Sequence, residues 1–169
     1  NSRLKADKQH PVRLYYNDFD GNGRKETILT YFHDGFEKPF ANKFELEKQL
    51  PVLKKKFLYA ENFAKATLEE LFSAEKLKSS IVHHADHFAT TLYINEGKGK
   101  FRPIIMDSPL QWSPCRAASI IDINGDKLPD LLTGGNFYGA NIEMGRYDAD
   151  YGTMSVNLGQ GKFQVLKLQ

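Results

Sequence analysis

DFDGNGRKE (residues 18–26) and DINGDKLPD (residues 122–130) are two copies of one acidic loop. Each copy places oxygen-bearing side chains at loop positions 1, 3, 5 and 9, and a glycine at position 4. Glycine lets the chain coil tightly, so that alternate side chains can turn towards a common centre. An apolar stretch follows each loop. The matched spacing therefore predicts one structure and one role for both.

That role is predicted to be calcium binding, because calcium prefers about six to eight hard oxygen ligands. The first site would use side-chain oxygens of Asp18, Asp20, Asn22 and Glu26 and the backbone carbonyl of Arg24. The second would use Asp122, Asn124, Asp126 and Asp130 and the backbone carbonyl of Leu128. The second site is predicted to be the stronger, since its three aspartates give more negative charge, whereas Arg24 and Lys25 place positive charge beside the first site.

The same loop residues have two other interpretations. An EF-hand needs a glutamate at position 12, where the two loops have Leu29 and Thr133. The flanking residues are also β-branched or aromatic, which indicates strands rather than helices. The second alternative is a pair of solvated turns in which Asp and Asn side chains bind nearby backbone groups. This alternative stays open at the level of sequence.

A second repeat predicts the rest of the β structure. NEGKGKF (residues 95–101) and NLGQGKF (residues 157–163) each lie between β-patterned stretches and are typical of hairpin turns. Each copy of the larger unit then has four predicted strands, at 12–17, 27–33, 88–95 and 100–106, and at 117–121, 131–134, 152–157 and 162–168. Four short antiparallel strands are the plan of a propeller blade. We therefore predict a mainly β chain with two four-stranded propeller-type blades, residues 1–107 and 108–169, forming part of a β-propeller.

Extra sequence inside the first copy is predicted to form a helical insertion at about 40–80, with helices at about 42–80. Leu46, Leu50, Leu53 and Phe57 form one apolar stripe at helical spacing, and Pro51 is expected to begin a second helix. Two capping boxes, Asn42-x-x-Glu45 and Thr67-x-x-Glu70, mark helix starts. A third short helix is expected over 71–77.

Composition and missing motifs exclude several classes of function. The formal net charge of +2 is too small to favour a nucleic-acid partner, and no apolar run approaches the roughly 20 residues of a membrane span. There is no phosphate-binding loop, nucleophile elbow or HExxH motif. His83, His84 and His87 would point to both faces of a strand, which favours a structural role over zinc binding. The chain is predicted to be non-catalytic.

A tyrosine-rich segment, residues 134–152, is the candidate ligand-binding loop. Aromatic and polar side chains on a long loop suit a sugar or a protein partner, and packing between blades accounts for the same aromatics equally well. The candidate ligand-binding residues are Tyr138, Tyr147, Asp148 and Tyr151.

The acidic loops resemble the FG-GAP/VCBS repeats of integrin-α-type propellers. The closing NxGxGKF hairpins and the segment GGNFYG (residues 134–139) are similar to VCBS-repeat proteins of the bacterial ASPIC/UnbV, cartilage-acidic-protein-like kind. The resemblance covers most of the chain beyond Val12. It implies propeller blades with one calcium ion in each loop, an extracytoplasmic location (periplasmic, cell-surface or secreted) and a role in binding or adhesion.

The family closes a ring of about seven blades, whereas this sequence contains two. With neither an initiator methionine nor a signal peptide at its start, the chain is expected to be a piece of a longer protein. The expected partners are therefore the remaining blades or a second copy of the chain, and a polysaccharide or protein ligand. The alternative function is an accessory region of a larger secreted carbohydrate-active enzyme.

Overall fold

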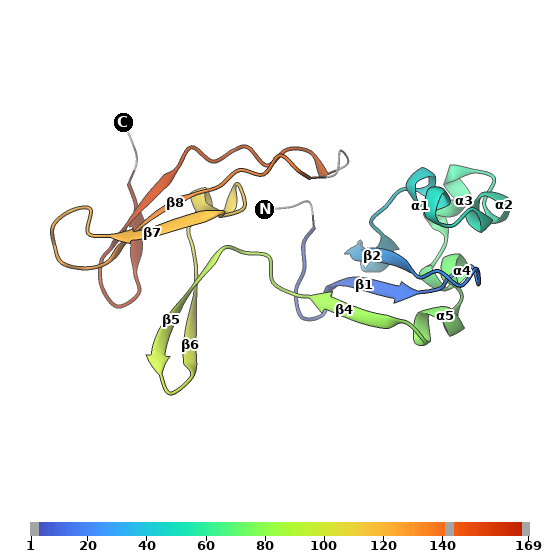
Figure 1. Cartoon of the computed structure of the whole chain (residues 1–169), viewed down its shortest axis with the longest axis horizontal. Coiled ribbons are helices and arrows are strands. Elements are labelled where there is room, and N and C mark those ends of the chain that lie inside the picture. Colours follow the sequence, from blue (N-terminus) through green and yellow to red (C-terminus); the bar gives the residue numbers. More distant parts are fainter. Residues whose placement is uncertain (1–3, 141–143, 167–169) are drawn as a thin grey trace. The chain divides into compact units, whose positions relative to one another are not determined.

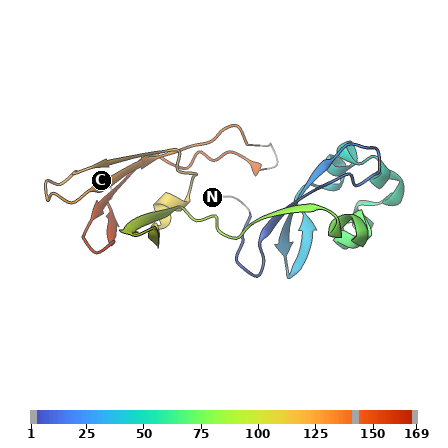
Figure 2. The ribbon, with the colours of Figure 1, turned by 60° about the horizontal axis from the view of Figure 1, so that its bottom comes forward.

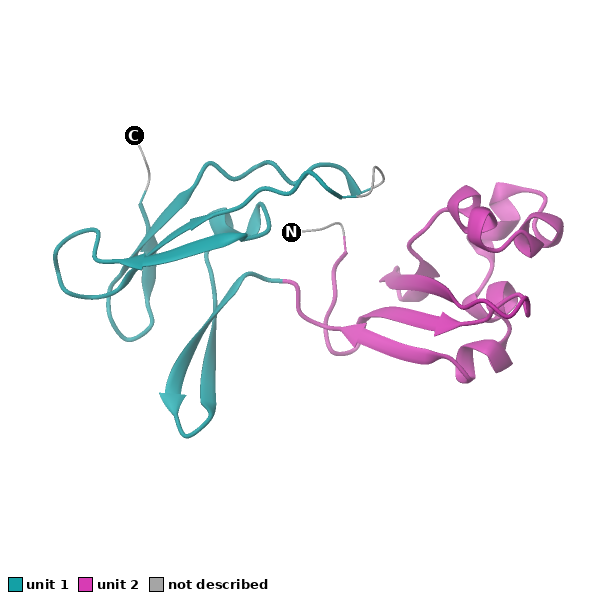
Figure 3. Ribbon diagram, in the orientation of Figure 1, with its two compact units in different colours: residues 1–3, 89–169 teal, residues 4–88 magenta. Residues whose placement is uncertain are grey.

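The computed structural model describes residues 4–140 and 144–166. Of the residues that the structure describes, 35% lie in strands and 21% in helices, so this part of the chain is mainly β, as predicted. The sheets are antiparallel and none of them is closed. The chain forms two compact units with a boundary between Phe88 and Ala89 (Figure 3), whereas the repeats predict a boundary after residue 107.

Unit 2, Leu4–Phe88, contains a four-stranded antiparallel sheet. Its strands are β1 (Val12–Asn17), β2 (Glu26–His33), β3 (Phe36–Pro39) and β4 (Ile81–Ala85), in the order β3-β2-β1-β4. The first three strands are joined by short connections. The fourth returns after the helices to pair with β1 (Figure 1), which gives the strand order of a Greek key.

This sheet corrects the predicted composition of the first blade. The hairpin of β5 (Thr91–Gly97) and β6 (Lys100–Ile105) does not pair with β1 and β2 but forms a separate two-stranded sheet in unit 1. Strand β3 takes the place beside β2, because Asp34 and Gly35 both have positive φ angles, 50° and 79°. Two such residues form the tight turn whose twist suits a hairpin.

The helical insertion is confirmed, and it forms five short helices. They are α1 (Lys43–Gln49), α2 (Val52–Lys56), α3 (Ala60–Lys65), α4 (Leu68–Phe72) and α5 (Ala74–Lys78). Asn42 accepts a hydrogen bond from the Glu45 amide, and Thr67 and Glu70 form the complete capping box. The helix expected over 71–77 is interrupted at Ser73, whose φ of 63° ends α4 and whose side chain caps α5.

The core of unit 2 lies between the helices and the sheet. The predicted stripe of Leu46, Leu50 and Leu53 is buried, each side chain being 1% exposed, with Phe57 packed beside it. The other buried members are Phe19, Ile28, Phe63, Ala66, Leu68, Leu71 and Phe72. Figure 2 shows the helices, turquoise to green, gathered at one end of the sheet. Part of the sheet therefore lacks helical cover.

Unit 1 contains a second four-stranded antiparallel sheet, close to the predicted one. Its strands are β7 (Ala117–Ile121), β8 (Asp130–Gly134), β9 (Thr153–Asn157) and β10 (Phe163–Val165), and their order β10-β9-β8-β7 follows the sequence. A single 3-10 turn, η1 (Ser108–Gln111), precedes β7. Met106, Leu110 and Leu131 form the core of the unit. Among the described residues, no helix has the length and apolar character that a membrane crossing requires.

Candidate metal centre

Both acidic loops connect two adjacent antiparallel strands in the same register. Loop 18–26 joins β1 to β2, and loop 122–130 joins β7 to β8. Position 9 of each loop is the first residue of the second strand, and it pairs with the residue just before position 1: Glu26 with Asn17, and Asp130 with Ile121. The hairpin therefore brings the two ends of each acidic motif together.

The carboxylate at position 1 organises the turn in the same way in both loops. Asp18 Oδ1 accepts from the Gly21 amide at 2.7 Å, and its Oδ2 accepts from the Gly23 amide at 3.0 Å. Asp122 repeats this with the amides of Gly125 at 2.7 Å and Lys127 at 3.0 Å. Each carboxylate thus holds the amides of positions 4 and 6.

The other side-chain oxygens also match position for position. Glu26 Oε2 accepts from the amide at position 2 at 2.9 Å, and Asp130 Oδ2 does so at 2.8 Å. Position 3 accepts from the amide of position 5, at 3.1 Å in the first loop and 3.0 Å in the second. Position 5 accepts from the amide of position 7 at 2.7 Å in both. The predicted structural identity of the loops is confirmed.

Positive φ angles fall at the same two positions. Position 4 is glycine in both loops, with φ of 78° at Gly21 and 80° at Gly125. Position 6 is Gly23 in the first loop, with φ of 86°, and Lys127 in the second, with φ of 67°. A residue with a Cβ is disfavoured in this left-handed region. The second loop therefore has the same backbone conformation as the first, although this conformation is unfavourable for Lys127.

The loops differ in how their carboxylates gather. In the first, oxygens of Asp18, Asp20 and Glu26 all lie within 4.8 Å of one another. The second has no such trio in the part of the chain that the structure describes. Its position 3 is Asn124, whose side-chain amide donates to Asp126 at 2.9 Å. The three aspartates that favoured the second loop are therefore less closely grouped, and this geometry favours the first.

Loop 18–26 is fastened to the helices by residues that the sequence pattern did not reveal. Phe19, at position 2, packs against Phe72 of α4 with ring centroids 5.2 Å apart. Lys76 of α5 donates through Nζ to the Asp18 carbonyl. The Lys76 carbonyl in turn accepts from the Asn17 side chain at 2.8 Å. No local motif marks Lys76, because its contact depends on the return of the chain after the insertion.

Loop 122–130 is fastened to β9 instead. The side chain of Asp130 is completely buried, and its Oδ1 accepts from the Asn157 amide at 2.7 Å. The Asn157 side chain donates to the Pro129 carbonyl at 3.1 Å. Asn157 begins the NLGQGKF repeat, so the hairpin motif and the acidic motif belong to one hydrogen-bonded structure.

Hydrogen bonding lowers the pKa of two loop aspartates. For Asp18 the main cause is the Gly23 amide, helped by the amides of Gly21 and Asn22 and by the positive charge of Lys76, and opposed by burial. For Asp130 the main cause of the lowered pKa is the hydrogen bond from the Asn157 amide. The amides of Ile123 and Asn124 lower the pKa further, whereas burial raises it. Both groups are therefore held as carboxylates.

The pKa of Asp130 predicts acid sensitivity of unit 1 in the absence of metal. Since its folded-state pKa lies below the unfolded value of about 3.9, its contribution is present above that pH and is lost as the pH falls through the folded-state pKa. Thermal melts in EDTA, followed by Trp112 fluorescence, should show the melting temperature decreasing as the pH falls below about 4.

Asp130→Asn should lower the melting temperature at neutral pH and reduce its dependence on acid pH. Asp107→Asn, which replaces a side chain that makes no cap hydrogen bond, is the control. An acid dependence unchanged by Asp130→Asn would contradict the assignment.

The tyrosine-rich segment does not present its candidate residues together. Phe137 and Tyr147 form an antiparallel bridge, and the Tyr147 hydroxyl is buried with no hydrogen-bond partner among the described residues. Tyr138 is 66% exposed and Tyr151 is 94% exposed. Asp148 is exposed as well. Tyr147 thus points inward while the other candidates face solvent, and residues 141–143 of the segment lie outside the described residues.

Comparison of the chain with protein-family models, curated proteins and solved structures finds no match. The candidate metal centre is therefore interpreted from its own residues and geometry.

Proposed function

We propose that this chain is a calcium-stabilised, non-catalytic recognition module that binds calcium at loops 18–26 and 122–130. The observation that carries the proposal is the repetition of one hydrogen-bonding scheme, position for position, in two loops far apart in the sequence. Both loops also have positive φ angles at positions 4 and 6. A turn that only had to connect two strands would not need the same side-chain oxygens at four matched positions.

The chemistry of the ligands favours calcium. In loop 18–26 the three carboxylates within 4.8 Å repel one another unless a cation lies among them. Side-chain oxygens from four alternate positions, with the carbonyls of Arg24 and Leu128 as proposed further ligands, match the oxygen-rich coordination of calcium. Magnesium binds fewer protein ligands and keeps more of its water.

Solvated turns are the competing explanation, and the hydrogen bonds of the loops fit it in part. Amide donors satisfy Asp18 and Asp130 without any metal. Amide donors also bind Asp20 and Glu26, but they leave the charge repulsion among the three clustered carboxylates without a neutralising cation. The carboxylate trio is therefore the place where the two explanations make different predictions.

Calcium titration of the EDTA-treated, dialysed chain by isothermal calorimetry tests the proposal. The wild type is expected to bind two ions, and calcium at about 100 times the dissociation constant should stabilise each loop's unit by about 2.7 kcal/mol. Glu26→Gln keeps an acceptor for the Phe19 amide but removes one carboxylate, and should weaken one of the two sites at least about tenfold. Glu61→Gln, at an exposed glutamate of the same unit, is the matched control.

Two results would overturn the calcium assignment. One is a wild-type chain that binds no calcium and melts at the same temperature with calcium and with EDTA. The other is an equal loss of affinity in Glu26→Gln and Glu61→Gln, which would place the ion elsewhere. Either result would favour solvated turns.

The recognition role is proposed from the resemblance to FG-GAP/VCBS repeats and from the open sheets. Each residue of the edge strand β7 is exposed, including Ile120 at 70% and Ile121 at 46%. An open edge with apolar side chains suits pairing with further strands. We propose propeller-type blades that associate with further blades or a second copy, in an extracytoplasmic setting, and that recognise a polysaccharide or a protein.

A further inference from the structure

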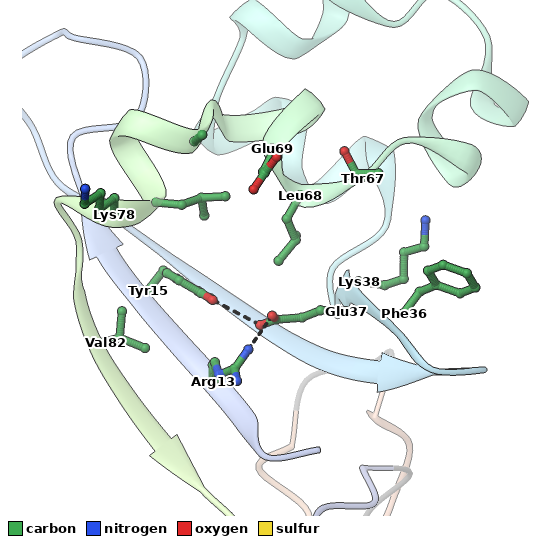
Figure 4. A pocket seen from close by; sticks show the side chains of 12 residues that line it. Arg13, Tyr15, Phe36, Glu37, Lys38, Thr67, Leu68, Glu69, Lys78 and Val82 are labelled. Carbon is green, nitrogen blue, oxygen red and sulfur yellow. Dashed lines mark hydrogen bonds and ion pairs between the residues drawn. The ribbon is translucent and has the colours of Figure 1, made fainter. Parts of the chain in front are cut away.

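Unit 2 contains a cavity of about 700 Å³ that no part of the calcium proposal uses. It lies on the helix-bearing face of the sheet, between β1, β3 and β4 on one side and α4 and α5 on the other (Figure 4). Its volume falls within the range of about 300–1,000 Å³ typical of small-molecule sites. Charged groups line it close to the apolar core of the unit, which calls for an explanation.

A polar network forms the floor of this cavity, around Glu37. The Glu37 carboxylate is only 16% exposed and accepts hydrogen bonds from three side chains: Arg13, Tyr15 at 3.2 Å and Thr30 at 2.6 Å. The strand pairing places these residues on one face, since Arg13 lies opposite Thr30 and Phe32 lies opposite Glu37. The network is therefore fixed by the sheet itself.

This network keeps hydrogen-bonding capacity for a ligand. A guanidinium group has five N–H donors, and the Arg13 side chain is still 31% exposed. Its central carbon lies 5.4 Å from the centre of the Phe32 ring, which fixes its position. The Tyr15 hydroxyl donates to Glu37 and so retains acceptor lone pairs. Burial and the charge of Glu37 raise the pKa of Tyr15, so the hydroxyl keeps its proton.

The walls of the cavity are apolar, and its charges are mixed. Leu68, Leu77 and Val82 contribute aliphatic surface, and the largely exposed ring of Phe36 also lines the cavity. Besides the pair of Arg13 and Glu37, the charged lining residues are Lys38, Glu69 and Lys78. Lys38 is held by the carbonyls of Ala64 and Ala66 at 3.2 and 2.8 Å. Positive and negative groups both line the cavity, which disfavours a strongly charged ligand.

We propose that this cavity binds a neutral sugar residue. Adjacent hydroxyl groups of a pyranose need donors and acceptors side by side, which Arg13, Tyr15 and Glu37 supply. The C–H face of the ring needs an apolar surface, which Leu68, Leu77 and Val82 supply. The proposal rests on the proposed recognition role. The proposed ligand contacts do not include the metal, because none of the lining residues belongs to the acidic loops.

NMR amide-shift titration of the whole chain with methyl β-glucoside, methyl β-galactoside and methyl N-acetylglucosaminide tests this proposal. At about 10 mM, a glycoside with a dissociation constant of about 1 mM would be nine-tenths bound. We expect at least one glycoside to shift the amides of Arg13, Glu37 and Leu77. Titrations in calcium and in EDTA separate this inference from the metal proposal, because a failure of calcium binding leaves the glycoside shifts interpretable.

Two tryptophan substitutions provide the decisive comparison. Ala74 and Ala60 are both exposed first residues of short helices, but Ala74 lines this cavity and Ala60 lines a different one, beside Tyr31 and Phe44. Ala74→Trp should weaken glycoside binding at least about tenfold by filling the cavity, whereas Ala60→Trp should leave it unchanged. Shifts that survive Ala74→Trp, or no shifts with any glycoside, would overturn the proposal. Shifts produced by benzoate but by no glycoside would overturn the ligand class.

Discussion

Leu50→Ala is expected to lower the free energy of unfolding of unit 2 by about 3 kcal/mol. Leu50 is 1% exposed and lies at the end of α1, within the cluster that joins the helices to the sheet. Its removal leaves a cavity that the neighbouring side chains fill only in part. Urea denaturation followed by the helical circular dichroism signal measures the loss, because α1 to α5 all lie in this unit.

Phe44→Ala, on the same helix, is the control for Leu50→Ala. The Phe44 side chain is 67% exposed, so its truncation should change the free energy of unfolding by less than about 1 kcal/mol. Equal losses at the two positions would show that the inner face of α1 is not packed as described.

Gly135→Ala is expected to destabilise unit 1 by about 3 kcal/mol or more. A Cβ at Gly135 would lie 2.1 Å from the Pro114 carbonyl oxygen and 2.5 Å from the Arg116 amide nitrogen. Both are backbone atoms that cannot rotate away, so the segment before β7 would have to move. Trp112, the single tryptophan of the chain, lies close to this segment in sequence, so its fluorescence during urea denaturation measures the effect.

Gly134→Ala is the matched control, one residue earlier in the chain. The nearest atom to a Cβ at Gly134 would be the Asp150 Oδ2, at 3.9 Å, an ordinary contact distance. Its free energy of unfolding should change by less than about 1 kcal/mol. If both alanine variants were as stable as the wild type, the close approach of the backbone at Gly135 would be wrong.

The acidic loops could be predicted from the sequence because their structure is local. The side chain at position 1 binds the amides at positions 4 and 6, so both partners lie within five residues of each other. The spacing of Asp18 and Gly21 is therefore enough to predict the turn. The attachments of the loops could not be predicted in this way. Lys76 and Asn157 reach the loops from distant parts of the chain, and only the folded structure brings them close.

The first sheet shows a different limit of sequence analysis. Neither edge strand belongs to the predicted sheet, because β3 is only four residues long and the two histidines of β4 interrupt the apolar alternation that predicts a paired strand. Asp34-Gly35 was a readable hairpin signal for β3. The pairing of β4 with β1 had no local signal, because the helical insertion separates the two strands.

Helix α5 belongs to both proposed sites. Its Lys76 holds the Asp18 carbonyl, while Ala74, Leu77 and Lys78 line the proposed sugar cavity. An ion that repositions loop 18–26 would therefore also act on a wall of that cavity. Thermodynamic linkage makes such an effect symmetric, so that any factor by which calcium changes the glycoside affinity is the factor by which the glycoside changes the calcium affinity.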